Sequence, residues 1–453
     1  MTIDHDSPST TDATLSPRLR RAIEGTPYAQ YVYGYPHKTA YRALEPPRAL
    51  DALWTQEFES GALRRDALFL YVHVPFCEMR CGFCNLFTTV RPEGSLEERY
   101  LTALATQARV VRAALGDVSF ARLAIGGGTP TWLDPPQLEA LFAVIERTMG
   151  ARPQQVPVSV ETSPETATDE RLAVLQAHGV DRVSIGVQSF FEEDTKAMGR
   201  PQKRATVEAA LERIRARSFA TLNVDLIYGA ATQTADRWLE SLSLALRYAP
   251  EELYLYPLYV RPLTGLAKGA RHWDDHRLSL YRIGRDFLCS NGYQQSSMRM
   301  FRRADAPAPA APPYACQSDG MVGLGCGARS YTSALHYSEE WAVGATSVRE
   351  ILEAYVRRDE REFATARYGV ALSPDEQLRR RAILSLLSDE GLASREASLA
   401  LPELSSLRAA ALVEQRPDGT LVLSERGLER ADAVGPALFS DAMTDRMEAF
   451  SLR

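Results

Sequence analysis

The feature that most constrains the fold is a regular alternation of short apolar, β-branched segments with longer amphipathic ones, beginning at residue 68. Six such strand–helix units predict parallel strands joined by right-handed crossovers, in an open α/β sheet or a barrel that falls short of the usual eight units. The expected strands are 68–74, 121–127, 156–161, 182–187, 222–229 and 252–260, and the expected helices are 96–115, 136–148, 168–178, 203–217 and 235–248.

The most distinctive polar and glycine-rich motifs follow the ends of these strands. They are residues 73–84, residues 126–130, Glu161, Gln188 and Asp225. In both architectures ligands bind beyond the carboxyl ends of the strands. We therefore expect one ligand site that is shared by these motifs.

The character of the sequence changes along the chain, and this predicts five segments. Residues 1–18 are polar and are expected to form a flexible tail. Residues 19–67, with the tyrosine-rich stretch YPHKTAYR, should pack on the barrel formed by residues 68–265 and contact substrate or another domain. Residues 266–372 should extend the barrel with ligand loops. Residues 373–453 predict a winged-helix-like domain, from helices at 374–388, 393–399 and 402–413 and an extended pair at about 414–424.

Composition argues against several classes of partner. The net charge of -6 provides no general basic field for nucleic acid or an anionic membrane. No apolar run reaches the roughly 18 residues of a membrane span, and the polar N-terminus does not resemble a secretory signal. We expect a cytoplasmic protein without nucleic-acid or membrane partners, although the winged-helix-like segment leaves DNA binding as a less favoured alternative.

Three of the six cysteines are clustered and three are scattered. Cys77, Cys81 and Cys84 form the pattern C-x3-C-x2-C, whereas Cys289, Cys316 and Cys326 are expected to be packing residues. Thiolates at this spacing suit an iron–sulfur cluster with one open iron, which the amino and carboxylate groups of S-adenosylmethionine (SAM) could occupy. Electron transfer would then give a 5′-deoxyadenosyl radical. A zinc site or three buried cysteines are the alternatives, and zinc-finger spacing to a fourth ligand is absent.

Seven motifs occur in a fixed order, and with them the chain resembles the radical SAM enzymes of the oxygen-independent coproporphyrinogen III oxidase-like family from about residue 68 to the C-terminus. They are YVHVPFC-x3-C-x2-C, GGGTPTWL, ETSPE, RVSIGVQSF, MGRPQ, NVDLIYG and GLGCGA. The resemblance implies an α/β fold, a partial (β/α)6 radical SAM barrel with a C-terminal helical domain. It also implies that the three clustered cysteines hold a [4Fe-4S] cluster.

The resemblance further implies roles for individual residues, although each polar strand-end residue could instead cap a turn. Tyr71 and His73 would lie near the cluster as catalytic candidates, or His73 could be a buried, satisfied histidine. Glu161 and Arg200 would meet the amino and carboxylate groups of SAM. The other expected cofactor-binding residues are Gly126, Gly127, Gly128 and Thr129 beside its methionine moiety, Gln188 and Asp225 near its ribose, Ile227, and Tyr314, Gly325 and Arg329 near a second SAM.

The sequence departs from the oxidases at three places. Asn85 and Leu86 follow the third ligand where the oxidases have a further Cys, Ala230 and Ala231 replace Leu-Pro, and Arg329 stands at an aliphatic position. We favour a class C methylase or cyclopropanase that uses a second SAM to modify an sp2 carbon of a small conjugated molecule. An oxygen-independent coproporphyrinogen III oxidase and a haem chaperone are the alternatives. The expected partners are a small-molecule substrate and an external electron donor such as flavodoxin or ferredoxin.

Overall fold

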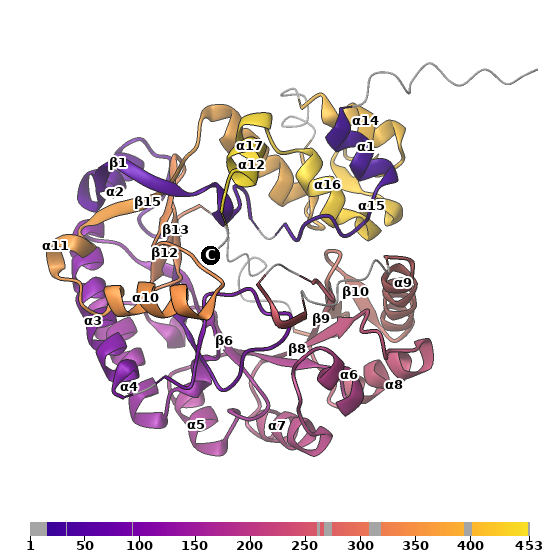
Figure 1. Cartoon of the computed structure of the whole chain (residues 1–453), viewed down its shortest axis with the longest axis horizontal. Helices are drawn as coiled ribbons and strands as arrows, with labels where there is room; N and C mark the ends of the chain where they lie inside the picture. The colour runs from indigo at the N-terminus through magenta and orange to yellow at the C-terminus, as the bar shows by residue number, and fades with distance from the viewer. Residues whose placement is uncertain are drawn as a thin grey trace, which may run out of the picture. The chain divides into compact units, whose positions relative to one another are not determined.

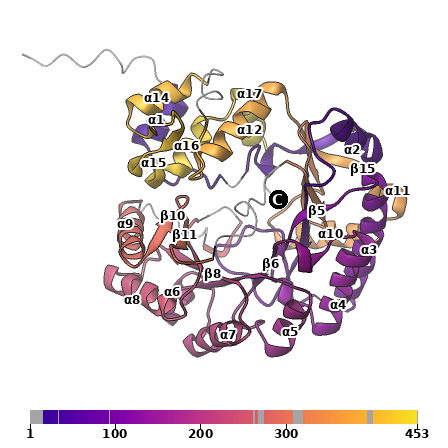
Figure 2. The ribbon, with the colours of Figure 1, turned by 180° about the vertical axis from the view of Figure 1, so that it is seen from behind.

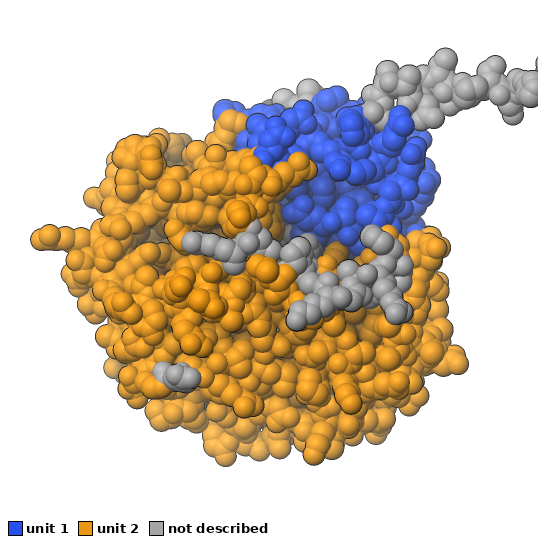
Figure 3. Space-filling view, in the orientation of Figure 1, with its two compact units in different colours: residues 1–36, 296–298, 374–445 blue, residues 37–295, 299–373, 446–453 orange. Residues whose placement is uncertain are grey.

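The computed structural model describes residues 16–451 except 33, 93, 261–262, 267–273, 308–318 and 394–400. The chain divides into two compact units (Figure 3). Unit 1 contains residues 1–36, 296–298 and 374–445, and unit 2 contains residues 37–295, 299–373 and 446–453. None of the helices in the described ranges is long and apolar enough to cross a membrane.

Parallel strands form the centre of unit 2, as the sequence predicts. Each of the six expected strands is present and pairs in parallel with the next one along the chain. A further strand, β12, pairs in parallel with β2 and was not expected. These strands are β2 (Leu68–Val74), β5 (Phe120–Gly127), β6 (Val158–Thr162), β7 (Arg182–Gln188), β8 (Thr221–Tyr228), β9 (Glu252–Pro257) and β12 (Met321–Leu324).

The crossover helices lie along the outer side of this sheet in both views (Figures 1 and 2). Several begin at the polar caps that their sequences provide: the Thr168 and Thr234 hydroxyls each accept a backbone N–H of the first turn, and Asp134 forms a capping box with Gln137. All five predicted helices are present in the structure. They are α3 (Leu96–Leu115), α4 (Pro135–Ala143) with its π-helical continuation (Val144–Thr148), α5 (Asp169–Ala177), α7 (Arg204–Ala216) and α8 (Ala235–Leu246).

Antiparallel strands extend the sheet at both edges, so that it contains 13 strands within the described ranges. The sequence did not predict these strands, because most are short and lack a clear two-residue alternation. One edge continues through β13 (Arg329–Tyr331), β14 (Leu335–Ser338), β15 (Thr365–Ala371) and β1 (Arg42–Ala49), and the other through β11 (Met300–Arg303) and β10 (Tyr293–Gln295). Unit 2 also includes α2 (Leu50–Glu59), α6 (Glu192–Ala197), α9 (Asp274–Ser290), α10 (Ala345–Tyr355) and α11 (Glu360–Phe363).

Unit 1 combines the expected C-terminal helices and hairpin with the start of the chain. Arg380 donates to the Tyr35 carbonyl at 2.5 Å, and the Gln30 amide donates to the Asp432 carbonyl at 3.0 Å. Residues 17–36 thus pack in unit 1, which corrects our expectation that all of 19–67 packs on the barrel. The expected helix 393–399 falls almost entirely outside the described residues. Unit 1 comprises α1 (Pro17–Glu24), α12 (Pro374–Leu386), α14 (Glu403–Ala409), β16 (Val413–Gln415), β17 (Leu421–Leu423), α15 (Glu425–Glu429), α16 (Ala431–Ala437) and most of α17 (Asp441–Glu448).

Candidate active site

The three clustered cysteines lie on a loop that follows β2. The loop runs between the short strands β3 (Phe76–Cys77) and β4 (Thr89–Val90), which pair in parallel and close it. At its centre, the Gly82 amide donates to the Gly199 carbonyl at 3.1 Å. The backbone of the loop is therefore held at both ends and in the middle.

Two thiols of this loop, those of Cys77 and Cys84, are poor sites for negative charge unless a cation binds them. Burial, with a further contribution from the neighbouring thiols, raises the pKa of Cys77 to about 12, and burial also raises that of Cys84. Iron bound to the thiolates would offset this cost, because metal ions stabilise deprotonated cysteine. Among the described residues no three His, Cys, Asp or Glu side chains converge on one ion. In a cubane cluster each thiolate binds its own iron.

Each cysteine sulfur has its own side-chain hydrogen-bond donor: two donors come from other parts of the chain and one comes from the cysteine loop itself. The Thr129 hydroxyl lies 3.7 Å from the Cys77 sulfur, and Arg200 Nη1 lies 3.4 Å from the Cys81 sulfur. The Cys84 sulfur receives the backbone N–H of Leu86 and the hydroxyl of Thr88. Sequence reasoning missed Thr88, because only the path of the loop brings it to the sulfur.

The glycine loop after β5 leaves space between the cysteines and β6. A Cβ on Gly126 would lie 2.9 Å from the Glu161 carboxyl carbon, and a Cβ on Gly128 would lie 3.0 Å from the Cys77 sulfur. Gly127 has a φ of 111°, which favours glycine. These residues form a cradle that side chains would fill, and together with the three thiols they fit a cluster with SAM.

Glu161 is the one exposed residue of β6, whose other four residues are buried. Its carboxylate accepts the Gly127 amide at 3.1 Å. Protein atoms surround the carboxyl on most sides and raise its pKa to about 7, although it still reaches solvent. A carboxylate that is desolvated but accessible suits a ligand amino group.

Gln188 and Arg200 come together at the end of β7. Gln188 has a φ of 67°, follows an irregularity in the β7–β8 pairing, and packs against Gly186. Arg200 donates to the Gly186 carbonyl at 2.9 Å. Gln202, which we did not predict, donates to the Val187 carbonyl at 2.6 Å and holds the same turn. Arg200 thus lies close to both a cysteine ligand and the end of β7.

Asp225 is held from two sides. The Asn223 amide donates to it at 2.7 Å, and the Ser184 hydroxyl lies 3.5 Å away. Burial nevertheless raises the pKa of Asp225 to about 6. Asn223 was not predicted, although it precedes Asp225 by two residues and therefore shares its face of the strand. Its own side-chain oxygen is buried with no hydrogen-bond donor in the described part of the chain.

Tyr71 and His73 lie two residues apart on one face of β2, but His73 is enclosed. Its Nε2 lies 3.0 Å from the Phe87 carbonyl, and its Nδ1 lies 3.3 Å from the Tyr71 hydroxyl. Burial lowers the pKa of His73 to about 4, so the ring is neutral near pH 7. This is the geometry of a buried, satisfied histidine that positions the cysteine loop. A catalytic role for Tyr71 or His73 stays a prediction.

The remaining predicted residues are dispersed. Ile227 is buried in an apolar cluster with Phe83 of the cysteine loop. The Gly325 amide donates to Gln107 of α3 at 2.7 Å. Arg329 begins β13, and its charge contributes to the lowered pKa of His73. Tyr314 lies outside the described residues.

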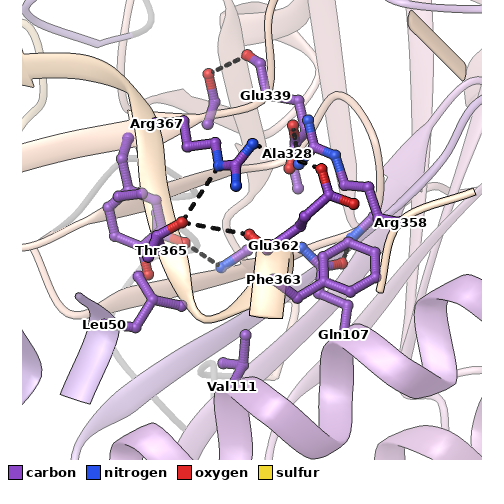
Figure 4. Close-up of a pocket in the computed structure, with 16 residues that line it drawn as sticks. Leu50, Gln107, Val111, Ala328, Glu339, Arg358, Glu362, Phe363, Thr365 and Arg367 are labelled. Carbon is purple, nitrogen blue, oxygen red and sulfur yellow. Dashed lines mark hydrogen bonds and ion pairs between the residues drawn. The ribbon is translucent and has the colours of Figure 1, made fainter. Parts of the chain in front are cut away.

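A separate cavity of about 40 Å³ lies against α3 and α11 (Figure 4). Gly325 is one of its lining residues, so the glycine-rich turn after β12 faces this cavity. Arg358 pairs with Glu339 at 2.6 Å, and Arg367 donates to Thr365 at 3.3 Å. Both arginines that line the cavity therefore bind other residues that line it.

Comparison with known proteins supports the interpretation of the cysteine loop as a radical SAM site. The Radical SAM superfamily model matches residues 71–245. The oxygen-independent coproporphyrinogen III oxidase of Cereibacter sphaeroides is 30% identical over 359 residues, which are 75% of this chain and 76% of that protein. The heme chaperone HemW of Bacillus subtilis is 30% identical over 267 residues, 58% of this chain and 70% of that protein.

The fold is also that of a solved relative. The structure of coproporphyrinogen III oxidase (HemN) from Escherichia coli has a TM-score of 0.74 at 22% identity, and the match covers 90% of this chain and 96% of that one. The family implies a [4Fe-4S] cluster and SAM, and Cys77, Cys81 and Cys84 are the residues that would hold the cluster. The chain belongs to the oxygen-independent coproporphyrinogen III oxidase-like family of radical SAM enzymes.

Proposed function

We propose that this radical SAM enzyme is an oxidoreductase of the oxygen-independent coproporphyrinogen III oxidase type, acting on a tetrapyrrole that bears propionate groups. The observation that carries the proposal is the 30% identity to a protein of that name across three quarters of both chains. This favours the oxidase alternative over the methylase interpretation that the sequence departures suggested.

The chain's own residues would bind and orient the reactants. When bound, the cluster and SAM supply an electron and a 5′-deoxyadenosyl radical. Glu161, beside the glycine cradle, and Arg200, beside the Cys81 sulfur, offer opposite charges, which suits the amino and carboxylate groups of SAM. Asp225 offers hydrogen-bond acceptors for ribose hydroxyls, and the Asn223 amide fixes its orientation at 2.7 Å. Such positioning is what a hydrogen abstraction requires.

One structural observation keeps a second function in view, the class C methylase or cyclopropanase. Leu86 is 47% exposed at the position where the resemblance to the oxidases leads us to expect a thiol. Leu86 offers no thiol at this position, and this departure from the oxidases is what favours the second candidate. A haem chaperone is a third candidate, supported by the identity to the Bacillus protein of that name.

The products separate these functions. Protein reconstituted anaerobically would be reduced and incubated with coproporphyrinogen III and methyl-labelled SAM, with a Cys77→Ser, Cys81→Ser, Cys84→Ser variant as the control. The proposal predicts 5′-deoxyadenosine and carbon dioxide from the wild type, an unlabelled tetrapyrrole product, and neither product from the variant. Label in the product or S-adenosylhomocysteine would point to a methylase, and stoichiometric haem binding without turnover to a chaperone. Either result would overturn the proposal.

A further inference from the structure

Three contacts fix the side chain of Arg200 between the end of β7 and the cysteine loop. Its Nη1 lies 3.4 Å from the Cys81 sulfur, its Nη2 donates to the Gly186 carbonyl at 2.9 Å, and its Nε donates to the Gln202 side-chain oxygen at 3.3 Å. A guanidinium is a rigid plane whose N–H groups point in fixed directions. Contacts at Nε, Nη1 and Nη2 together therefore determine the orientation of the plane.

The amide of Gln202 is itself held in one orientation. Its Nε2 donates to the Val187 carbonyl at 2.6 Å and to the Ser189 carbonyl at 3.2 Å. A flipped amide would set its oxygen against these two carbonyl oxygens and its N–H groups against the Nε–H of Arg200. The two carbonyls therefore direct the side-chain oxygen of Gln202 toward Arg200.

The backbone around Arg200 is held against the cysteine loop. The Arg200 amide donates to the Thr195 carbonyl at 2.8 Å, and the neighbouring Gly199 carbonyl accepts the Gly82 amide at 3.1 Å. A Cβ on Gly199 would lie 2.8 Å from the Gly82 Cα, so glycine is needed for this close approach. Because the backbone is fixed, the place of the guanidinium depends on its side-chain contacts, of which Gln202 supplies the one at Nε.

We propose that Gln202 is a positioning residue, which through Arg200 sets the hydrogen bond to the Cys81 sulfur and orients the guanidinium for the carboxylate of SAM. The cluster and SAM are those that the family implies, and the proposal goes beyond the proposed function because it does not depend on the substrate. A cation that donates to a thiolate sulfur stabilises the reduced, more negative state of a bound cluster, and hydrogen bonds to the sulfurs help to set cluster potentials. Gln202 therefore influences both the cluster potential and SAM binding.

A purely structural role is the alternative, because the same amide braces a strained turn. Val187 and Ser189 flank Gln188, whose φ is 67°. Loss of Gln202 by this route would loosen the turn whether or not Arg200 were present. A double-mutant cycle separates the two roles, since an effect that passes through Arg200 disappears when Arg200 is replaced, whereas a structural effect persists.

The experiment uses the full chain, reconstituted anaerobically. Gln202→Met replaces the amide by an apolar, unbranched side chain of similar length, Arg200→Met removes the guanidinium, and the double variant completes the cycle. Ser189→Ala is the matched control, because it removes the hydrogen bond to Asp194 at 3.1 Å in the same turn but keeps the backbone carbonyl that Gln202 binds. The cluster midpoint potential is measured without SAM, and SAM affinity is measured by equilibrium dialysis.

We expect Gln202→Met to lower the midpoint potential and to weaken SAM binding, each by about three- to tenfold in the corresponding equilibrium constant. A tenfold change for one electron is about 59 mV. In the Arg200→Met background, Gln202→Met should change neither value further, and Ser189→Ala should leave both at the wild-type level. Equal effects of Gln202→Met in the two backgrounds, or no effect in either, would overturn the proposal.

Iron content and melting temperature of every variant show whether the cluster and the fold are retained. If Gln202→Met binds less iron than wild type, Gln202→Asn, which keeps the amide on a side chain one carbon shorter, takes its place in the cycle. Loss of iron from both Gln202 variants would overturn the proposal, because it would show that the residue holds the cysteine loop itself and not the guanidinium.

Discussion

Ionisation of Glu161 should control how tightly the protein binds SAM. With a pKa of about 7, the carboxyl is about nine-tenths ionised at pH 8 and about one-tenth ionised at pH 6. If only the carboxylate serves the ligand, affinity falls about tenfold across this interval. Asp225, whose pKa is about 6, adds roughly a further factor of two. Because only the ionised carboxylate serves the ligand and the pKa of Glu161 is raised, SAM affinity is lost as pH falls through about 7.

The assay compares wild type with Glu161→Gln, which keeps the size of the side chain but cannot ionise. SAM affinity of reconstituted protein would be measured by equilibrium dialysis between about pH 6 and pH 8. Titration of the ligand itself is common to both proteins and cancels in the ratio of their affinities. We expect the advantage of the wild type to grow about tenfold from pH 6 to pH 8. A ratio that does not change with pH would refute the reasoning.

Three further predictions follow from contacts described above. Gly128→Ala places a Cβ 2.5 Å from the Phe76 carbonyl oxygen and 3.0 Å from the Cys77 sulfur, so iron bound on reconstitution should fall well below the wild-type amount; equal iron content would contradict the cradle. Thr88→Val removes a hydrogen bond to the Cys84 sulfur, which should make the cluster midpoint potential more negative by up to about 59 mV, the equivalent of a tenfold change, while Thr88→Ser should restore it. Desolvation alone would lower the pKa of His178, but hydrogen bonds that its ring donates to the Glu146 and Glu139 carboxylates outweigh it and raise the pKa. The histidine therefore stabilises the fold below its unfolded pKa and loses this contribution as pH rises through the folded value, so the melting temperature of His178→Gln should fall further below wild type at pH 6 than at pH 8.

The sequence predicted the parallel part of the fold well because that part has a strong period. Buried strands and amphipathic helices alternate from residue 68, and their bounds agree with the structure to within about three residues at most ends. The antiparallel edges were missed because strands such as β13 contain only three residues. Residues 17–36 were misassigned because helix α1 packs on α16, more than 400 residues away, and no local pattern reports such a contact.

The site residues that could be predicted from the sequence are those that lie at or just after the ends of parallel strands. Cys77, Glu161 and Asp225 follow from spacing and from the rule that ligands bind beyond parallel strands. Thr88 could not be found in this way, because its hydrogen bond to the Cys84 sulfur depends on the path of the loop. His73 stood out in the sequence, yet only its two hydrogen bonds reveal that it is enclosed.

The most direct test of the central claim is formation of 5′-deoxyadenosine. Reconstituted wild-type protein, reduced and supplied with SAM in the absence of oxygen, would be compared with the variant in which Cys77, Cys81 and Cys84 are all serine. We expect 5′-deoxyadenosine to accumulate with the wild type alone. Its absence from a wild-type protein that holds a full [4Fe-4S] cluster, or equal amounts with both proteins, would contradict the assignment of this loop as the radical-generating site.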